Sequence, residues 1–343
     1  MITDYFEINQ NQNYQFINEK IQFKQNNSSS LNSIKVEWNQ LYNRSTITNF
    51  ISNYPLKLMQ TINDNNLSNY FKIIYLLGYG GGTVSRDQIQ LFLNICHKAA
   101  LIILTPGSMK IYKRSNPNEC PQQNIFSKIE SNSTLLYLPT HTVPFANSAH
   151  FQSHIVDMNY SSNLMIFDSM SSGRYETNEQ WKFDYYESFN LIRVDQQILI
   201  RERLRLGNQH VNDAHLFKLY NAHCLLLILG PRFYNANVQL YQNLSNRKLS
   251  NSQDVGHMQH NSTRSRPRSL ISCSWIGQNE PEYVDNNEII NSLINHEANE
   301  NIICGIVVRC CAVTVEIMYS TLNFYLSHYN LVIQELNKAP WNI

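Results

Sequence analysis

Short apolar runs separated by turn-forming residues dominate the middle of the chain. FKIIYLLGYGGG reads as a buried segment that ends in a glycine turn, and ALIILT and TLLYLP are further apolar runs bounded by glycine or proline. HIVD and LMIFD follow, separated by the polar turn NYSSN, so we expect these two runs to be the paired strands of a hairpin. The pattern predicts a β-sheet.

Helices are expected beside this sheet. Ser85 and Gln88 fit a capping box, and apolar residues then recur at helical spacing as far as Cys96. The segment 179–206 and the closing segment CGIVVRCCAVTVEIMYSTLNFYL are also compatible with helix. Together these elements predict an α+β domain with a central mixed sheet flanked by helices.

Two polar tracts frame this predicted domain. Residues 1–35 are dominated by Asn, Gln and Ser, and they read as a leader that cannot build a core alone. Residues 36–343 would hold the domain, with a low-complexity insertion around 240–270.

Composition and charge narrow the classes of function. The formal net charge of +1 gives no overall field to attract nucleic acid or an acidic membrane, so neither partner is expected. The seven cysteines show no repeated CxxC spacing, which argues against a zinc cage or a disulfide framework. With no signal peptide or membrane-length apolar run, we expect a nuclear or cytoplasmic protein, and the oligomeric state stays open.

One set of residues suggests catalysis by a thiol. His150 would begin one strand of the expected hairpin and Asp168 would end the other, which places the imidazole beside a carboxylate that can orient it as a base. Cys304 would be the nucleophile, since the apolar segment after it could be a helix whose amino terminus favours a thiolate. Gly305 would let a substrate backbone approach closely.

These residues resemble the ubiquitin-like-protein-specific cysteine proteases, the SUMO-type Ulp family, and their adenain-type viral relatives. The resemblance lies in His150-Phe151, in Asp168 after an apolar strand, and in Cys304-Gly305 followed by aliphatic residues. It implies a papain-like, Ulp-type fold with the nucleophile at a helix amino terminus. It also implies hydrolysis of the carboxyl-terminal Gly-Gly linkage of a ubiquitin-like modifier through a thioester, without a metal or organic cofactor. The partner would be a ubiquitin-like protein or its conjugates.

The sequence departs from that family around the oxyanion site. Glu297 and Ala298 occupy the positions where the family carries glutamine, so Asn299 or Asn301 would have to supply the side-chain N–H. Phe151, which would help to position substrate, stands where the family usually has tryptophan.

Three alternatives stay open. Cys224 is a rival nucleophile, because its separation from Asp168 is closer to the family's usual spacing. The chain could also be a pseudoprotease that binds a ubiquitin-like protein without cleaving it. The third alternative is a viral or transposon-type polyprotein endopeptidase.

Overall fold

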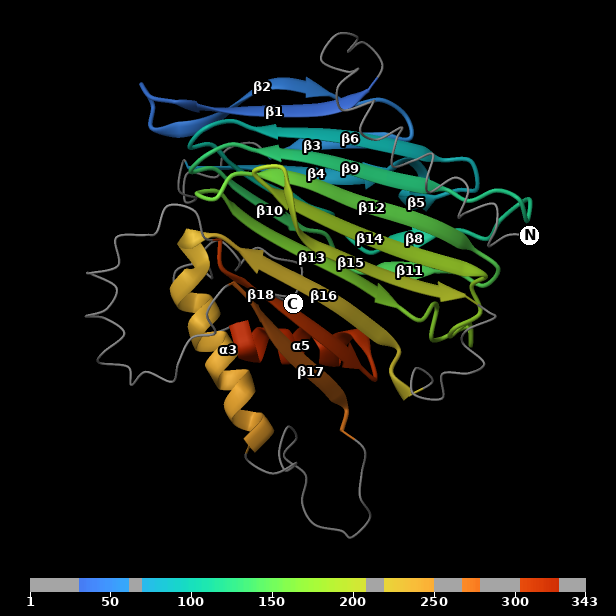
Figure 1. The fold of residues 1–343 in the computed structure, drawn as a ribbon. Coiled ribbons are helices and arrows are strands. Elements are labelled where there is room, and N and C mark those ends of the chain that lie inside the picture. The colour runs from blue at the N-terminus through green and yellow to red at the C-terminus, as the bar shows by residue number, and fades with distance from the viewer. Residues whose placement is uncertain (1–30, 62–69, 208–218, 250–266, 278–302, 327–343) are drawn as a thin grey trace.

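Two β-sheets lie face to face in this protein (Figure 1). The computed structural model describes residues 31–61, 70–207, 219–249, 267–277 and 303–326. The first sheet has seven strands, in the order β15 (Gln197–Gly207), β14 (Tyr185–Val194), β12 (Ala149–Met158), β9 (Gln122–Ile129), β6 (Gln88–Ile95), β1 (Asn32–Asn39) and β2 (Arg44–Ile51).

The second sheet has eleven strands. Its main order is β17 (Ser269–Ile276), β18 (Gly305–Ala312), β16 (Ala222–Leu229), β13 (Asn163–Ser171), β10 (Thr134–Leu138), β7 (Ala100–Leu104), β4 (Phe71–Gly78) and β3 (Leu56–Gln60). The short strands β5 (Gly82–Thr83), β8 (Met109–Ile111) and β11 (Thr142–Pro144) attach at one side. Two single-turn helices, η1 (Tyr79–Gly81) and η3 (Pro231–Phe233), follow β4 and β16.

From β6 to β14 the chain crosses between the two sheets at each main strand. β6, β9, β12 and β14 lie in the first sheet, whereas β7, β10 and β13 lie in the second, and neighbours within each of these sets are parallel. The backbone therefore winds as a flattened coil, and each strand pairs with the strand one winding earlier.

Four-residue turns make three of these crossings. The turns are residues 96–99, 130–133 and 159–162, and each is closed by a hydrogen bond from the last backbone N–H to the first carbonyl. Neighbouring turns also bond to each other, for example through the backbone N–H of Lys98 and the carbonyl of Ser131, at 3.3 Å. The turns thus form a ladder that holds successive windings in register.

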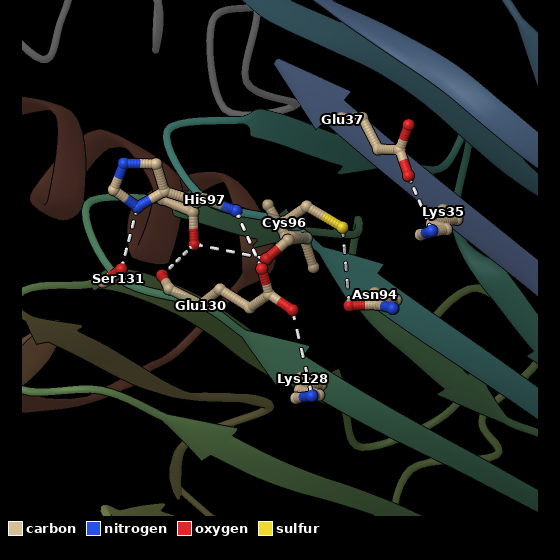
Figure 2. Close-up of polar contacts among 10 residues, drawn as sticks. Lys35, Glu37, Asn94, Cys96, His97, Lys128, Glu130 and Ser131 are labelled. Atoms are coloured by element: carbon tan, nitrogen blue, oxygen red, sulfur yellow. Dashed lines mark hydrogen bonds and ion pairs between the residues drawn. The ribbon is translucent and has the colours of Figure 1, made fainter. Parts of the chain in front are cut away.

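Side chains reinforce the first two turns, as Figure 2 shows. The backbone N–H of His97 donates to the Glu130 carboxylate at 3.0 Å, and the His97 ring is 2.8 Å from the Ser131 hydroxyl. Lys128 lies 3.8 Å from the other Glu130 oxygen. These are surface contacts, so we assign them to the packing of one turn on the next.

The main apolar core fills the space between the sheets near the turns. Strands of both sheets contribute alternate residues to it, including Leu91, Ile103 and Ile166. A second core lies on the other face of the eleven-stranded sheet, where helices α3 (Tyr234–Leu249) and α5 (Val315–Leu326) pack. No helix in the described part of the chain is long and apolar enough to cross a membrane.

The predicted apolar strands are present, but the helix expected after Ser85 is wrong. ALIILT and TLLYLP form β7 and β10, and FKIIYLLG forms β4, followed by Gly80 and Gly81 at φ values of 76° and 75°. The segment after Ser85 is strand β6, whose alternate residues are buried. Ser85 accepts a hydrogen bond from the backbone N–H of Ser115 at 2.9 Å instead of capping a helix.

The expected hairpin is also wrong. β12 pairs in parallel with β9 and β14, whereas β13 lies in the other sheet, between β10 and β16. The turn NYSSN is one of the stacked crossings between sheets. A turn of that length can close a hairpin or connect two sheets, so the local sequence did not distinguish the two connections.

The papain-like, Ulp-type fold is contradicted as a whole. Residues 179–206, expected to be helical, contain most of β14 and β15, and the two described α-helices cover one face of one sheet rather than flanking it. Cys304 precedes strand β18, so the nucleophile at a helix amino terminus is absent. Only the end of the closing segment is helical, as α5.

The polar tracts fall partly outside the described residues. The leader as expected, 1–35, overlaps β1, which starts at Asn32, and residues 1–30 lie outside. In the insertion expected around 240–270, residues 240–249 belong to α3 and 250–266 lie outside the described ranges.

Replacing Leu91 with alanine tests the assignment of the core between the sheets. Leu91 is fully buried there, so Leu91→Ala should lower the free energy of unfolding by about 2–5 kcal/mol in urea denaturation. Leu41, which is 90% exposed, is the matched control, and Leu41→Ala should change it by less than about 0.5 kcal/mol. Equal effects of the two substitutions would contradict this assignment.

Candidate functional site

The space between the two sheets changes from apolar to polar along the strands. Near the turns, β12 and β14 contribute Val156, Met158, Ile192 and Val194 to the apolar core. Farther from the turns, the same alternating positions become polar. These inward positions are His150, Gln152, His154, Tyr186, Ser188 and Asn190.

Asp168 of β13 projects into this polar region and is held by three side chains of the opposite sheet. Gln152 donates to one carboxylate oxygen at 2.8 Å, Asn190 donates to the other at 3.1 Å, and the Ser188 hydroxyl also donates to that second oxygen. Gln152 further bonds the Ser188 hydroxyl at 3.1 Å. We call these four residues the Asp168 cluster.

The electrostatics of the Asp168 cluster are those of a half-buried carboxylate with neutral hydrogen-bond donors. Burial raises the pKa of Asp168, while the hydrogen bonds from Ser188, Asn190 and Gln152 act to lower it. None of these three donors carries a positive charge, so they solvate the carboxylate without cancelling its charge. Such a group attracts a cation that enters the space beside it.

Three cavities lie in a row through this region. The first, about 260 Å³, is bounded by the glycine turn at Gly78–Gly82 and shares Met109 and Gln123 with the second, of about 30 Å³. The second shares Asp168 and its two β14 partners with a third of about 60 Å³. We call this row the inter-sheet passage, and its middle section lies at the Asp168 cluster.

An ion pair between the two sheets marks the far end of the inter-sheet passage. Glu202 of β15 and Arg309 of β18 both line the third cavity, and the Arg309 guanidinium donates to both Glu202 oxygens, at 2.9 and 3.2 Å. His223 of β16 lines the same cavity. This end therefore carries charged and ionisable groups, whereas the first cavity is largely lined by leucine, isoleucine and glycine.

The structure does not join His150 to Asp168. The three hydrogen bonds of the carboxylate come from other residues, and Gln152, two positions after His150, takes the place beside it. His150 is fully buried near the ring of Tyr186, and neither of its nitrogens makes a hydrogen bond of normal geometry to a described residue. Burial lowers its pKa to about 4, an effect that Gln152 partly offsets.

Cys304 lies away from both residues. In the strand register Asp168 is level with Arg309 of β18, and Cys304, just before the start of β18, is five residues from Arg309, roughly 17 Å at the usual rise per residue. Burial raises the pKa of its thiol, the opposite of what a nucleophile needs. Gly305 serves packing, since a Cβ there would lie 2.4 Å from the carbonyl oxygen of Ile228.

The other sequence-predicted residues are also dispersed. Cys224 is fully buried on the opposite face of the second sheet, in the core with the helices, and burial raises its pKa well above the usual value. Phe151 is half-buried in β12, next to the inward-facing Gln152 and therefore on the outer face. Asn299 and Asn301 lie outside the described residues.

A resident metal centre is not evident in the described part of the chain. Nowhere in it do three His, Cys, Asp or Glu side chains come together closely enough to hold a metal ion. The Asp168 cluster accordingly offers one carboxylate and neutral oxygen and nitrogen atoms.

Comparison with known protein families identifies the family of this chain. The family model described as UreD urease accessory protein matches residues 32–322, from the first strand of the described fold into α5. The chain belongs to the UreD family of urease accessory proteins.

Curated relatives agree with the UreD assignment across plants and fungi. Urease accessory protein D of Oryza sativa subsp. indica is 25% identical over 301 residues, 88% of this chain and 92% of the relative. The Arabidopsis thaliana protein of the same name is 28% identical over 252 residues, 71% of this chain and 85% of the relative. Urease accessory protein 4 of Cryptococcus neoformans is 30% identical over 209 residues, 52% of this chain and 64% of the relative.

Membership of the UreD family contradicts the prediction of a cysteine protease. The resemblance to SUMO-type and adenain-type proteases was wrong, and so were the cysteine-peptidase activity and the ubiquitin-like partner. The pseudoprotease and polyprotein-endopeptidase alternatives fall with them. The geometry agrees, because the proposed nucleophile, base and carboxylate do not converge.

Sequence reasoning selected Asp168 but missed the residues that surround it. Gln152, Ser188 and Asn190 were not considered, although a signal for them exists. In YYESFNLI the polar residues Ser188 and Asn190 occupy alternate positions of an otherwise buried strand, which indicates polar groups directed into a core.

The buried histidines should make stability depend on pH. Burial lowers the pKa of His154 to about 3, so below about pH 6.5 the unfolded chain takes up a proton that the folded chain does not. Stability should therefore fall as pH drops below about 6.5, by roughly 1.4 kcal/mol per pH unit for this residue.

Urea denaturation at pH 7.5 and pH 5.5 measures this effect. His154→Gln should lose less stability between the two pH values than the unsubstituted protein. His97→Gln, which changes an exposed ring, should keep the original dependence. An unchanged dependence in His154→Gln would show that His154 is not buried as a neutral imidazole.

Proposed function

We propose that this protein assists the maturation of urease and that it does so without catalysing a reaction of its own. The observation that carries the proposal is the match of the UreD model over nearly the whole described fold. The names of the rice, Arabidopsis and Cryptococcus relatives give the same accessory role. The dispersed cysteines and histidines support a role other than thiol hydrolysis.

We further propose that the inter-sheet passage handles the metal cargo that urease requires, a nickel ion. Three cavities with shared walls extend from the glycine turn to Glu202 of β15 and Arg309 of β18, and the half-buried carboxylate of Asp168 lies at their middle. One carboxylate with neutral donors favours entry of a divalent cation. The Asp168 cluster has no second or third anionic ligand among the described residues that would retain the ion.

Binding to other urease accessory proteins is part of this proposal. A passage through the protein serves delivery only if a donor and an acceptor sit at its two ends, so we propose that partner proteins cover the glycine-turn end and the β15–β18 end. The nuclear or cytoplasmic location expected from the sequence stays a prediction.

Asp168→Asn tests the role of the inter-sheet passage. The substitution keeps the shape of the side chain and removes its charge, so nickel-dependent urease activation should fall by about tenfold or more. The assay is the activity and nickel content of urease produced together with the other accessory proteins of the same organism. Glu176→Gln, which removes an exposed carboxylate, is the matched control and should leave activation unchanged.

A second variant distinguishes loss of the inter-sheet passage from loss of folding. Asn190→Leu should obstruct the inter-sheet passage while keeping a buried side chain, and it should reduce activation as Asp168→Asn does. Asn190→Leu should lower the melting temperature modestly, because it removes a hydrogen bond to Asp168, but every variant should still melt cooperatively and be recovered in the accessory complex to a similar extent. Full activation by both passage variants would refute the passage role, and full urease activity without this protein would refute the accessory role.

A further inference from the structure

A histidine and a cysteine stand opposite each other near the far end of the inter-sheet passage. His223 of β16 and Cys311 of β18 are register partners on adjacent antiparallel strands. Side chains in such positions have Cβ atoms about 4.5–5.5 Å apart, a spacing from which both can reach one small ion.

Both side chains project to the passage side of the sheet. Cys224 and Cys310, the next residues along each strand, belong to the core with the helices, and both are fully buried. Because side chains alternate along a strand, His223 and Cys311 face the other way, toward the first sheet. His223 accordingly lines the third cavity with Arg309.

His223 and Cys311 are each partly exposed, unlike the cysteine pair behind them. His223 and Cys311 can therefore approach an ion from two adjacent strands on the same face of the sheet. Glu202 makes its ion pair with Arg309, which leaves the imidazole and the thiol as the open ligands of this region.

We propose that His223 and Cys311 together bind a divalent transition-metal ion of the nickel class as it leaves the inter-sheet passage. The proposal rests on the proposed function for the identity of the cargo, but the binding itself does not depend on it. Imidazole and thiolate are the side chains that such ions prefer. Two protein ligands leave the remaining coordination positions to water, which suits transfer better than storage.

Binding at this pair must release a proton. Burial and the neighbouring Cys310 raise the pKa of the Cys311 thiol to about 11, so the thiol is protonated at neutral pH in the absence of metal. When the metal–sulfur bond forms, the thiol proton passes to solvent and His223 contributes its lone pair without a change of charge.

Nickel titration of the full-length, reduced protein tests this site. Nickel chloride is the probe, equilibrium dialysis gives the affinity, and near-ultraviolet absorption reports thiolate-to-nickel charge transfer. His223→Ala and Cys311→Ser should each weaken binding by about tenfold or more, and Cys311→Ser should abolish the absorption band. Cys311→His should retain binding but lose the band.

The chain offers a matched control pair in Cys96 and His97. These residues are adjacent in sequence, but Figure 2 shows that the thiol and the imidazole point in different directions. The His97 ring is already engaged with Ser131 at 2.8 Å. Cys96→Ser and His97→Ala should therefore leave nickel affinity and the absorption band unchanged.

The outcomes separate this site from the proposed function. Unchanged affinity in both His223→Ala and Cys311→Ser, with intact thermal melting, would refute the site, as would loss of the band in Cys96→Ser. Asp168→Asn should leave the band intact while impairing urease activation. If the band depends on Cys311 but no variant affects activation, the site stands and the passage role fails.

Discussion

The ladder of stacked four-residue turns is the constraint on which the rest of the structure depends. Each turn reverses the chain within four residues, and in all three cases the next strand enters the opposite sheet. Bonds between neighbouring turns then fix the register of one winding on the next. Because this register is fixed at one end of the strands, side chains far from the turns meet across the sheets reproducibly, and those distant positions form the Asp168 cluster.

Asp168 can be held as a half-buried carboxylate because its hydrogen-bond donors lie on strands rather than on loops. Gln152 lies on β12, whereas Ser188 and Asn190 lie two residues apart on β14, so all three hydrogen bonds depend on the pairing of these two strands. An unpaired buried carboxylate would cost several kcal/mol or become protonated. Preorganised neutral donors reduce that cost and leave the charge available. The site is therefore as rigid as the sheet that carries it.

The sequence predicted strands better than it predicted their partners. The apolar runs of β4, β7 and β10 were found because length and turn residues identify them locally. β6 was misread because Ile89, Phe92 and Ile95 fit a helical period, although Ile89, Leu91, Leu93 and Ile95 fit a strand equally well. Asp168 was found with the wrong neighbours for a similar reason. Which residue faces it depends on the alignment of two sheets, which no local pattern encodes. The histidine, aspartate and Cys-Gly patterns that suggested a protease are features that ordinary buried strands also produce.

The electrostatic attraction of a single carboxylate for a divalent ion is strong enough to draw the ion in but too weak to retain it. At about 4 Å and an effective dielectric constant near 20, a single carboxylate attracts a divalent cation by roughly 8 kcal/mol, and the water that the cation gives up offsets much of this. A second carboxylate in the same place would strengthen this attraction and hold the ion. In the inter-sheet passage the nearest other carboxylate lining a cavity with Asp168 is Glu202, and Arg309 neutralises it. The charge pattern thus permits an ion to reach Asp168 and to leave it, and neutral ligands such as His223 can then take the ion up without a second anionic trap.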